Sequence, residues 1–308
     1  MIRSNMISSD DKFISVVEWN DVSDPIGILQ ISHGMAEHAM RYDMFAKKMN
    51  EAGIIVVADD HRGHGETDKD THGYSRGNMW EETLSDMGNL LTKSKAKYSK
   101  IYGKELKTVI FGHSYGSFLT QEFIKRHRDE LQGAVIGGSN YFAGAVVHVG
   151  KLAAKIGISL RGDDHPNKFL EKMSFDAYNR RFKEGTFISS VLEECERYNN
   201  DKDCGFTCSS NFYYHFFKGS LKLYKHQGNN LMGFPILLVS GENDPVGNMG
   251  KGVKKLEKWY KTKNADVRCK LYSGVRHEYL NDISREETTE DIKNFCIKMF
   301  TKTNKDKE

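Results

Sequence analysis

A serine flanked by two glycines, in Gly112-x-Ser114-x-Gly116, directly follows the apolar run Thr108 to Phe111. This run predicts a short buried strand. The residues after it share one face of a predicted helix: Phe118, Leu119, Phe123 and Ile124. Because glycine has no Cβ, the backbone can turn tightly at both glycines. A strand, a sharp turn with serine at its apex and a helix predict a nucleophile elbow, with Ser114 at the positive end of the helix.

A serine hydroxyl becomes a good nucleophile only when a base removes its proton, and that base needs an acid that orients it. Functional loops of a parallel sheet lie at the carboxyl ends of its strands. Asp244 follows the predicted strand Pro235–Ser240, and His277 follows the predicted strand Val267–Tyr272. The order Ser114, Asp244, His277 is one established order of nucleophile, acid and base in serine hydrolases.

Simpler explanations exist for both partners. Asp244 before Pro245 is a common turn sequence, and His277 can be a surface-loop histidine. Glu242 competes as the acid, but it stands two residues nearer the strand and can still lie within the sheet. Three placements in the right order favour Asp244 and His277 as catalytic partners, with His113 as a packed neighbour of the elbow.

The carbonyl that the serine attacks becomes an oxyanion and needs preorganised hydrogen-bond donors. One donor is expected to be the backbone N–H of Tyr115, directly after the nucleophile. The other is expected to be the N–H of Met35, in the loop that leaves the predicted strand Ile26–Ile31. Gly34 lets this loop bend close to a substrate, so we count it among the substrate-binding residues.

Apolar runs and amphipathic stretches alternate over both ends of the chain. Strands are predicted at Lys12–Trp19 (an edge strand), Ile26–Ile31, Gly53–Ala58, Thr108–Phe111, Gly133–Gly138, Pro235–Ser240 and Val267–Tyr272. Helices are predicted at Glu37–Glu51, Trp80–Tyr98, Gly252–Lys261 and Glu286–Phe300. Within the first helix, Glu37 and Arg41 can pair across one turn. The alternation predicts an α/β fold with a mostly parallel central sheet flanked by helices.

The alternation stops between residues 141 and 230, where the sequence predicts no strand. We therefore divide the chain into a core formed by residues 1–140 and 231–308 and a helical cap or lid insertion formed by residues 141–230.

Two features of the insertion are apolar. One is a stripe at helical spacing: Val149, Leu152, Ile156 and Leu160. The other is the aromatic cluster Phe212–Phe217, and Phe187–Tyr198 predicts a further helix. The stripe and the cluster either line an acyl tunnel, with Phe212 and Tyr213 as substrate-binding residues, or touch a lipid surface, or form the core of the insertion itself.

Composition excludes several classes of function. Among 308 residues, 45 Lys and Arg against 42 Asp and Glu give a net charge of only +3, without the basic stripe that nucleic acid binding needs. No apolar run approaches the roughly 20 residues of a membrane span. The five cysteines are sparse and odd in number, so they predict reduced thiols in a cytoplasmic protein.

Two groups of residues resemble parts of metal sites. Cys204-x-x-x-Cys208 could supply half of a site, but no second Cys or His pair of suitable spacing follows. Asp60-His61-x-x-His64, with His72 nearby, matches neither common hydrolase metal motif. We expect these histidines to hydrogen-bond to backbone and to neighbouring carboxylates, and we expect no catalytic metal or cofactor.

Several motifs together resemble the monoglyceride lipase and lysophospholipase branch of the α/β-hydrolases, a serine aminopeptidase S33-type group. They are His33-Gly34-x-x-Glu37-His38-x-x-Arg41-Tyr42, Asp60-His61-Arg62-Gly63-His64-Gly65, Gly112-His113-Ser114-x-Gly116, Asp244-Pro245-Val246 and Gly274-x-x-His277-Glu278. The resemblance extends over about residues 12 to 300. It implies a cap over the active site and cofactor-free ester hydrolysis through an acyl-serine, with Ser114, Asp244 and His277 as the triad and Met35 and Tyr115 as the oxyanion hole.

The sequence departs from the pattern of this branch at Glu66-Thr67, Tyr115, Ser117 and Lys202-Asp203. None of these positions belongs to the triad, but Tyr115 can narrow the pocket beside the nucleophile. The expected function is a serine esterase for small-molecule acyl esters, with monoacylglycerols or lysophospholipids first. The alternative is a carboxylesterase or thioesterase for short acyl chains. A binding protein with a dead site is disfavoured by the intact triad and oxyanion loop.

Overall fold

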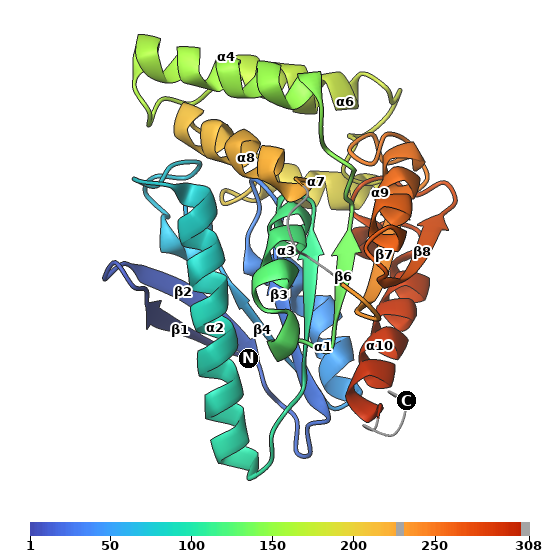
Figure 1. The fold of residues 1–308 in the computed structure, drawn as a ribbon. Helices are drawn as coiled ribbons and strands as arrows, with labels where there is room; N and C mark the ends of the chain where they lie inside the picture. The colour runs from blue at the N-terminus through green and yellow to red at the C-terminus, as the bar shows by residue number, and fades with distance from the viewer. Residues whose placement is uncertain (226–230, 303–308) are drawn as a thin grey trace.

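The computed structural model describes residues 1–225 and 231–302 of the chain. Its centre is an eight-stranded sheet in the order β1-β2-β4-β3-β5-β6-β7-β8 (Figure 1). The strands are β1 (Ile2–Ile7), β2 (Phe13–Trp19), β3 (Gly27–Ser32), β4 (Ile54–Asp59), β5 (Thr108–His113), β6 (Gly133–Gly137), β7 (Pro235–Gly241) and β8 (Asp266–Tyr272). In this sheet only β2 runs against its neighbours. The predicted α/β fold with a mostly parallel sheet is therefore confirmed.

Helices cover both faces of the sheet (Figure 1). On one face lie α1 (Asp43–Glu51) and α10 (Arg285–Thr301), and on the other lie α2 (Met79–Tyr102), α3 (Tyr115–Arg126) and α9 (Lys251–Lys261). Successive residues of β5 pack on opposite faces of the sheet. Ile110 packs on the α3 side, whereas Val109 and Phe111 pack on the α1 side. A strand covered on both faces must be apolar at every position, which is why continuous apolar runs predicted the central strands well.

The prediction of an edge strand at Lys12–Trp19 is wrong. β2 lies between β1 and β4, and β1 forms the edge. Only Met6 of β1 is buried, so this strand lacks the apolar pattern by which strands are recognised in a sequence.

The helix predicted at Glu37–Glu51 begins later than expected. A 3₁₀ helix covers Ala39–Tyr42, and α1 starts at Asp43. The carboxylate of Glu37 turns back and accepts a hydrogen bond from the N–H of Gly34, so the residues before Ala39 belong to the loop after β3. Further 3₁₀ turns lie at Gly65–Thr67, Arg128–Glu130 and Tyr279–Asn281.

Between β6 and β7 the described residues, up to 225, form helices and no sheet strand. They are α4 (Ala145–Arg161), α5 (Lys168–Glu171), a π-helical turn (Lys172–Asp176), α6 (Ala177–Asn179), α7 (Leu192–Asn200) and α8 (Ser210–Leu223). Figure 1 shows α4 and α8 stacked beyond one end of the sheet. Residues 226–230 of the predicted insertion lie outside the described residues.

The helix predicted at Phe187–Tyr198 starts only at Leu192. Residues Phe187 and Ile188 instead use their carbonyl oxygens to accept hydrogen bonds from the N–H groups of His277 and Glu278, at 3.1 and 2.7 Å. A tertiary contact thus replaces the helical pattern at this position.

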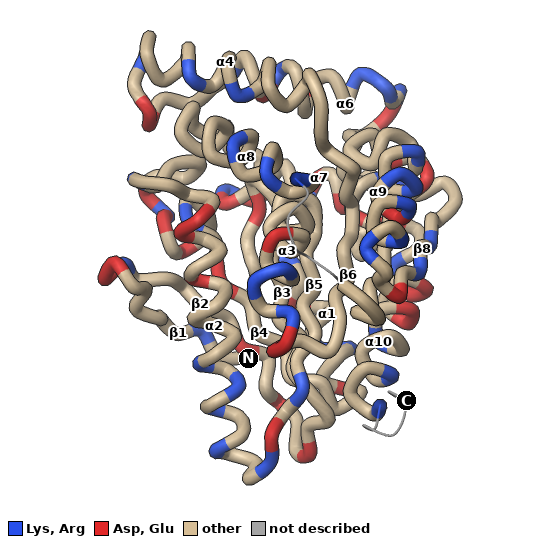
Figure 2. The backbone as a smooth tube through the Cα atoms, viewed as in Figure 1, with Lys and Arg blue, Asp and Glu red and all other residues tan. Residues whose placement is uncertain are grey.

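Charged residues are interspersed over the elements of the core (Figure 2). Helix α4 differs, because its three charged residues, Lys151, Lys155 and Arg161, are all basic. Within residues 1–225 and 231–302, no helix is both long and apolar enough to cross a membrane.

Candidate active site

Ser114 lies at the turn between β5 and α3, as the sequence predicted. Its φ of 50° and ψ of −119° form a conformation that residues other than glycine rarely adopt. The N–H of Ser114 donates to the carbonyl of Gly137 on β6 at 3.0 Å, which fixes the turn to the neighbouring strand. A Cβ at Gly116 would lie only 2.0 Å from the carbonyl oxygen of Ser32, so glycine is needed for α3 to approach β3.

Asp244 and His277 meet beyond the carboxyl ends of β7 and β8. Nδ1 of His277 lies 3.0 Å from Oδ2 of Asp244, an ion-pair contact that is bent away from ideal hydrogen-bond geometry. The hydroxyl of Ser240 donates to Oδ2 of Asp244 at 3.2 Å, and the N–H of Val246 donates to Oδ1 at 2.8 Å. Both Asp244 and His277 are buried, whereas the competing acid, Glu242, is exposed.

The surroundings of His277 favour its charged form. Burial, the largest single influence, lowers the pKa of His277, but Asp244 together with Glu278 and Glu37 outweighs it, so that the pKa is raised overall. Beside it, burial and the nearby His277 keep the pKa of His113 well below the usual range. The two imidazole rings lie 4.8 Å apart, so His113 is a neutral packed neighbour in the position that the sequence indicated.

The loop after β3 approaches the nucleophile. A Cβ placed on Gly34 would lie 3.2 Å from Cβ of Ser114. Among the described residues, the N–H groups of Met35 and Tyr115 have no hydrogen-bond partner in the protein. Met35, Ser114 and Tyr115 also line one cavity. The chain therefore holds two unpaired backbone donors next to the serine hydroxyl.

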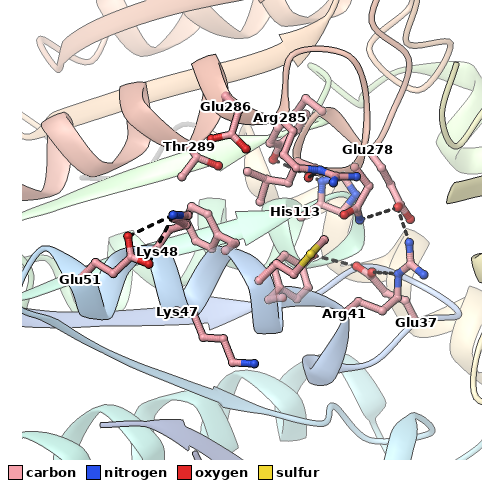
Figure 3. A pocket seen from close by; sticks show the side chains of 16 residues that line it. Glu37, Arg41, Lys47, Lys48, Glu51, His113, Glu278, Arg285, Glu286 and Thr289 are labelled. Carbon is pink, nitrogen blue, oxygen red and sulfur yellow. Dashed lines mark hydrogen bonds and ion pairs between the residues drawn. The ribbon is translucent and has the colours of Figure 1, made fainter. Parts of the chain in front are cut away.

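A buried charge cluster joins this loop to the His277 loop (Figure 3). Glu37 accepts hydrogen bonds from the N–H of Gly34 and, at 2.9 Å, from the hydroxyl of Tyr42. Arg41 lies 3.3 Å from Glu37, which confirms the predicted pair, and its other side binds Glu278. A pocket of about 300 Å³ opens along this cluster, with His113 among its lining residues.

The cavity beside Ser114 has a volume of about 260 Å³ and mostly apolar walls. Of the predicted substrate-binding residues, Tyr213 lines it, whereas Gly34 and Phe212 are not among its lining residues. Phe212 is buried and packs against Tyr115, with ring centroids 4.8 Å apart. Of the apolar stripe on α4, only Val149 contributes to the wall.

Several lining residues were not predicted to bind substrate, among them Phe118, Phe142, Ala153, Phe169, Met173, Tyr178 and Phe216. They come from five separate segments, α3, the start of the insertion, α4, the α5–α6 stretch and α8. Phe216 lay within the aromatic cluster, which was a usable signal. The others have no local pattern that indicates a cavity, because only the packing of these segments brings them together.

The histidines after β4 make the hydrogen bonds that the sequence analysis predicted. His61 contacts Asp59 and Ser32, each at 2.8 Å. His64 contacts the carbonyl of Arg62 at 2.9 Å and the N–H of Ala36 at 3.2 Å. Both rings are buried, so they stiffen the loop that carries Met35.

A doubly covered, mostly parallel sheet with a serine elbow after β5, and with an aspartate and a histidine after β7 and β8, defines an α/β-hydrolase. The model of the family described as serine aminopeptidase, S33, matches residues 23–284, and the chain belongs to this family.

Individual relatives point to the monoglyceride lipase branch of the α/β-hydrolases. The chain is 23% identical over 289 residues to a monoacylglycerol lipase of Mycolicibacterium smegmatis, with 91% of each chain covered. A carboxyl esterase from Bacillus coagulans, solved with glycerol, superimposes with a TM-score of 0.82 at 26% identity, over 97% of this chain and 99% of the other. A soluble variant of monoglyceride lipase from Saccharomyces cerevisiae, solved with a substrate analogue, shares the fold, with a TM-score of 0.73 at 19% identity over 98% and 96% of the two chains. The resemblance to monoglyceride lipases is thus confirmed.

Proposed function

We propose that this protein hydrolyses carboxylic esters through an acyl-enzyme on Ser114, and that its substrates are monoacylglycerols or lysophospholipids. The observation that carries the proposal is the position of Ser114, at the elbow, facing an apolar cavity, while Asp244 and His277 lie 3.0 Å apart beyond neighbouring strands. The named relatives, a monoacylglycerol lipase and a carboxyl esterase, support the same chemistry.

In the proposed mechanism, His277 takes the proton of the Ser114 hydroxyl as its oxygen attacks the ester carbonyl. Asp244 holds the imidazole in place and stabilises its positive charge. The oxyanion accepts hydrogen bonds from the N–H groups of Met35 and Tyr115. His277 then gives its proton to the departing alcohol, and a water molecule, activated by the same base, releases the carboxylic acid from Ser114.

The apolar cavity supports an acyl chain as the part of the substrate beside the serine. Its walls combine Tyr115 and Phe118 of α3 with Phe216 of α8 and the α5 region. Such walls stabilise hydrocarbon by burial, at about 25 cal/mol per Å² of apolar surface removed from water. We therefore assign the acyl chain to this cavity and treat residues 141–230 as a cap that completes it.

The outer surface of this cap supports contact with a lipid surface. Leu152, Ile156 and Leu160 are at least half exposed and follow one another along α4, while Phe169 and Met173 are exposed on the adjoining stretch. The basic residues of α4 would add attraction to anionic lipids. We propose that the enzyme takes its substrate from a micelle or membrane surface through this face.

The second candidate is a carboxylesterase or thioesterase for short acyl chains, which the similarity to the Bacillus coagulans esterase favours. A series of esters from acetyl to palmitoyl, with monoacylglycerols included, separates the two. Activity that collapses beyond about four acyl carbons would favour this candidate and contradict the lipase proposal. As part of the proposal we also place the protein in a reducing, cytoplasmic compartment, because its five cysteines are free.

Labelling with a fluorophosphonate tests the nucleophile. Wild type should gain one covalent adduct on Ser114, and Ser114→Ala should gain none and lose ester hydrolysis by several orders of magnitude. Ser117→Ala, three residues further along α3, is the matched control and should still be labelled. An adduct that forms equally on Ser114→Ala would contradict the proposal.

A further inference from the structure

A second group of reactive side chains lies where the helical insertion meets the loop after β3. It consists of His38, from that loop, and of Asp201 and Cys204, from the connection between α7 and α8. Nε2 of His38 lies 2.9 Å from Oδ2 of Asp201, and one ligand atom from each of the three residues lies within 4.8 Å of the others. His38 and Asp201 are 163 positions apart in the chain, so sequence spacing around Cys204 alone did not reveal the group.

The thiol of Cys204 points to a ligand. Cys204 is only 9% exposed. Within residues 1–225 and 231–302 its Sγ atom makes no hydrogen bond, whereas Sγ of the buried Cys195 donates to the carbonyl of Ser189 at 3.2 Å and accepts from the hydroxyl of Thr186 at 3.4 Å. Solvent still reaches the group, because the side chains of His38 and Asp201 are 12% and 30% exposed. A small ion can therefore reach the group from solvent. Its binding would break no hydrogen bond of the Cys204 thiol.

The backbone around the three residues is already fixed. The N–H of Cys204 donates to the carbonyl of Asp201 at 3.0 Å, which closes a turn. The N–H of Gly205 and the hydroxyl of Tyr198 both donate to the carbonyl of Ala36, each at 2.9 Å, so that this turn is docked beside His38. A ligand would meet three donors whose positions require little further ordering.

The charges around the thiol favour a cation. Arg41 acts on Cys204 more strongly than any single carboxyl group, but it is itself paired with Glu37 and Glu278. With Asp201 in the group, three carboxyl groups still face one guanidinium. An imidazole nitrogen, a carboxylate oxygen and a thiolate sulfur are the three ligand types that zinc accepts, with a fourth position often left to water. Harder ions such as magnesium and calcium prefer oxygen donors alone.

We propose that His38, Asp201 and Cys204 bind a divalent cation of the zinc type, with water as the fourth ligand. The ion binds between His38 and Asp201, where the imidazole carries its proton on Nδ1 and offers Nε2 to the ion. The Cys204 thiol releases its proton to solvent and binds as thiolate. Zinc bonds of about 2.0 Å to nitrogen and oxygen and about 2.3 Å to sulfur require the ligand atoms to approach one another slightly, which side-chain rotation allows.

The bound ion would fasten the α7–α8 turn to the loop that carries Met35. The three residues lie outside the serine site, and binding is measured without reference to ester hydrolysis. The proposal therefore stands or fails independently of the catalytic role of Ser114.

Isothermal titration calorimetry of the chelator-treated protein with Zn²⁺ tests the proposal, and Co²⁺ serves as a spectroscopic probe. Wild type should bind one equivalent, show a thiolate-to-cobalt charge-transfer band and melt at a higher temperature with zinc. Cys204→Ser should lose the band, and Cys204→Ser and His38→Gln should each weaken binding at least about tenfold.

Two neighbouring residues give matched controls. Cys208→Ser removes the other cysteine of this segment, and Asp203→Asn removes a carboxylate two positions from Asp201; both should bind like wild type. Near-ultraviolet circular dichroism checks that each variant is folded. No binding by folded wild type, unchanged binding by Cys204→Ser, or loss of the cobalt band in Cys208→Ser would each overturn the proposal.

Discussion

At the residue scale, the contact between His277 and Asp244 makes a prediction that separates the two candidate acids. Asp244→Asn removes the charge that stabilises the imidazolium, and the corresponding change in serine proteases lowers kcat about 10⁴-fold. Because the Asp244 carboxylate raises the pKa of His277, the ascending limb of the pH profile of kcat/KM should move to lower pH in the variant. Residual activity is measured with a soluble ester from pH 5 to 9.

The matched control is Glu242→Gln, two residues away and exposed. It should keep wild-type activity and the wild-type pH limb. A large loss in Glu242→Gln with none in Asp244→Asn would exchange the roles of the two acids.

Much of the candidate site could be predicted because each of its residues comes shortly after the end of a strand that is recognisable in the sequence. Ser114, Asp244 and His277 are found in this way. The partners that hold them were harder to find. Ser240, which donates to Asp244, is a small polar residue at the end of a buried strand, and Phe187 contacts His277 from the far side of the insertion. Neither has a recognisable local pattern. Ser240 reaches Asp244 across a turn whose shape the sequence does not specify, and Phe187 contacts a residue that is distant in the chain.

At the scale of elements, α4 has a face toward the cavity and a face toward solvent. Ala153 lines the cavity, and Ala153→Phe should fill part of the space assigned to the acyl chain. We expect kcat/KM for palmitoyl esters to fall at least about tenfold, whereas acetyl esters should change little, since a lost methylene contact contributes about 0.8 kcal/mol. Ile156→Phe, one turn further along α4 and exposed, should leave the chain-length profile unchanged.

The solvent face of α4 makes a separate prediction. A triple change, Leu152→Ser, Ile156→Ser and Leu160→Ser, should weaken binding to anionic phospholipid vesicles at least about tenfold, because each side chain buries apolar area in the lipid interface. Co-sedimentation with vesicles measures binding, and a soluble short-chain ester checks the active site.

The control triple, Ile7→Ser, Ile101→Ser and Ile283→Ser, removes equally exposed side chains from other parts of the surface. It should bind vesicles like wild type. Equal loss in the two triples would mean that general apolarity, and not this face, attracts lipid.

At the scale of the whole molecule, buried histidines link stability to pH. Burial lowers the pKa of His64 to about 3 and keeps the pKa values of His33 and His113 well below the usual range. Below about pH 6.5 these three histidines bind protons in the unfolded chain but not in the folded chain. Their contribution to stability is therefore full above that pH and falls as the solution becomes more acidic. Each histidine contributes up to about 1.4 kcal/mol of loss per pH unit.

Urea unfolding at pH 7, 6 and 5 measures this slope. His64→Gln should make the slope shallower, whatever its effect at pH 7, while His148→Gln on the exposed side of α4 should not change it. A slope that is the same in wild type and His64→Gln would show that the loop histidine is not the source.

The fold as a whole was predictable where burial on both faces makes strands apolar, and less so where the sheet meets solvent. Ile2–Ile7 carries Arg3 and Asn5 among its apolar residues and was missed, although it completes the sheet edge. The aromatic cluster at Phe212–Phe217 indicated an acyl tunnel, contact with a lipid surface or a core. Phe212 packs against Tyr115 in the core, whereas Phe216 lines the cavity. One helix can thus contribute some residues to the core and others to the cavity wall. Hydrophobicity alone does not tell which residues do which.

The backbone at Ser114, with φ of 50°, has a consequence for how the molecule can be improved. Glycine would occupy this conformation with less strain, and positions of this kind store on the order of 1–3 kcal/mol. A search for thermostable variants that scores melting temperature alone would therefore favour glycine in place of Ser114, the proposed nucleophile. Durability and reactivity make opposite demands on this single residue, and any engineering of the chain must select for both together.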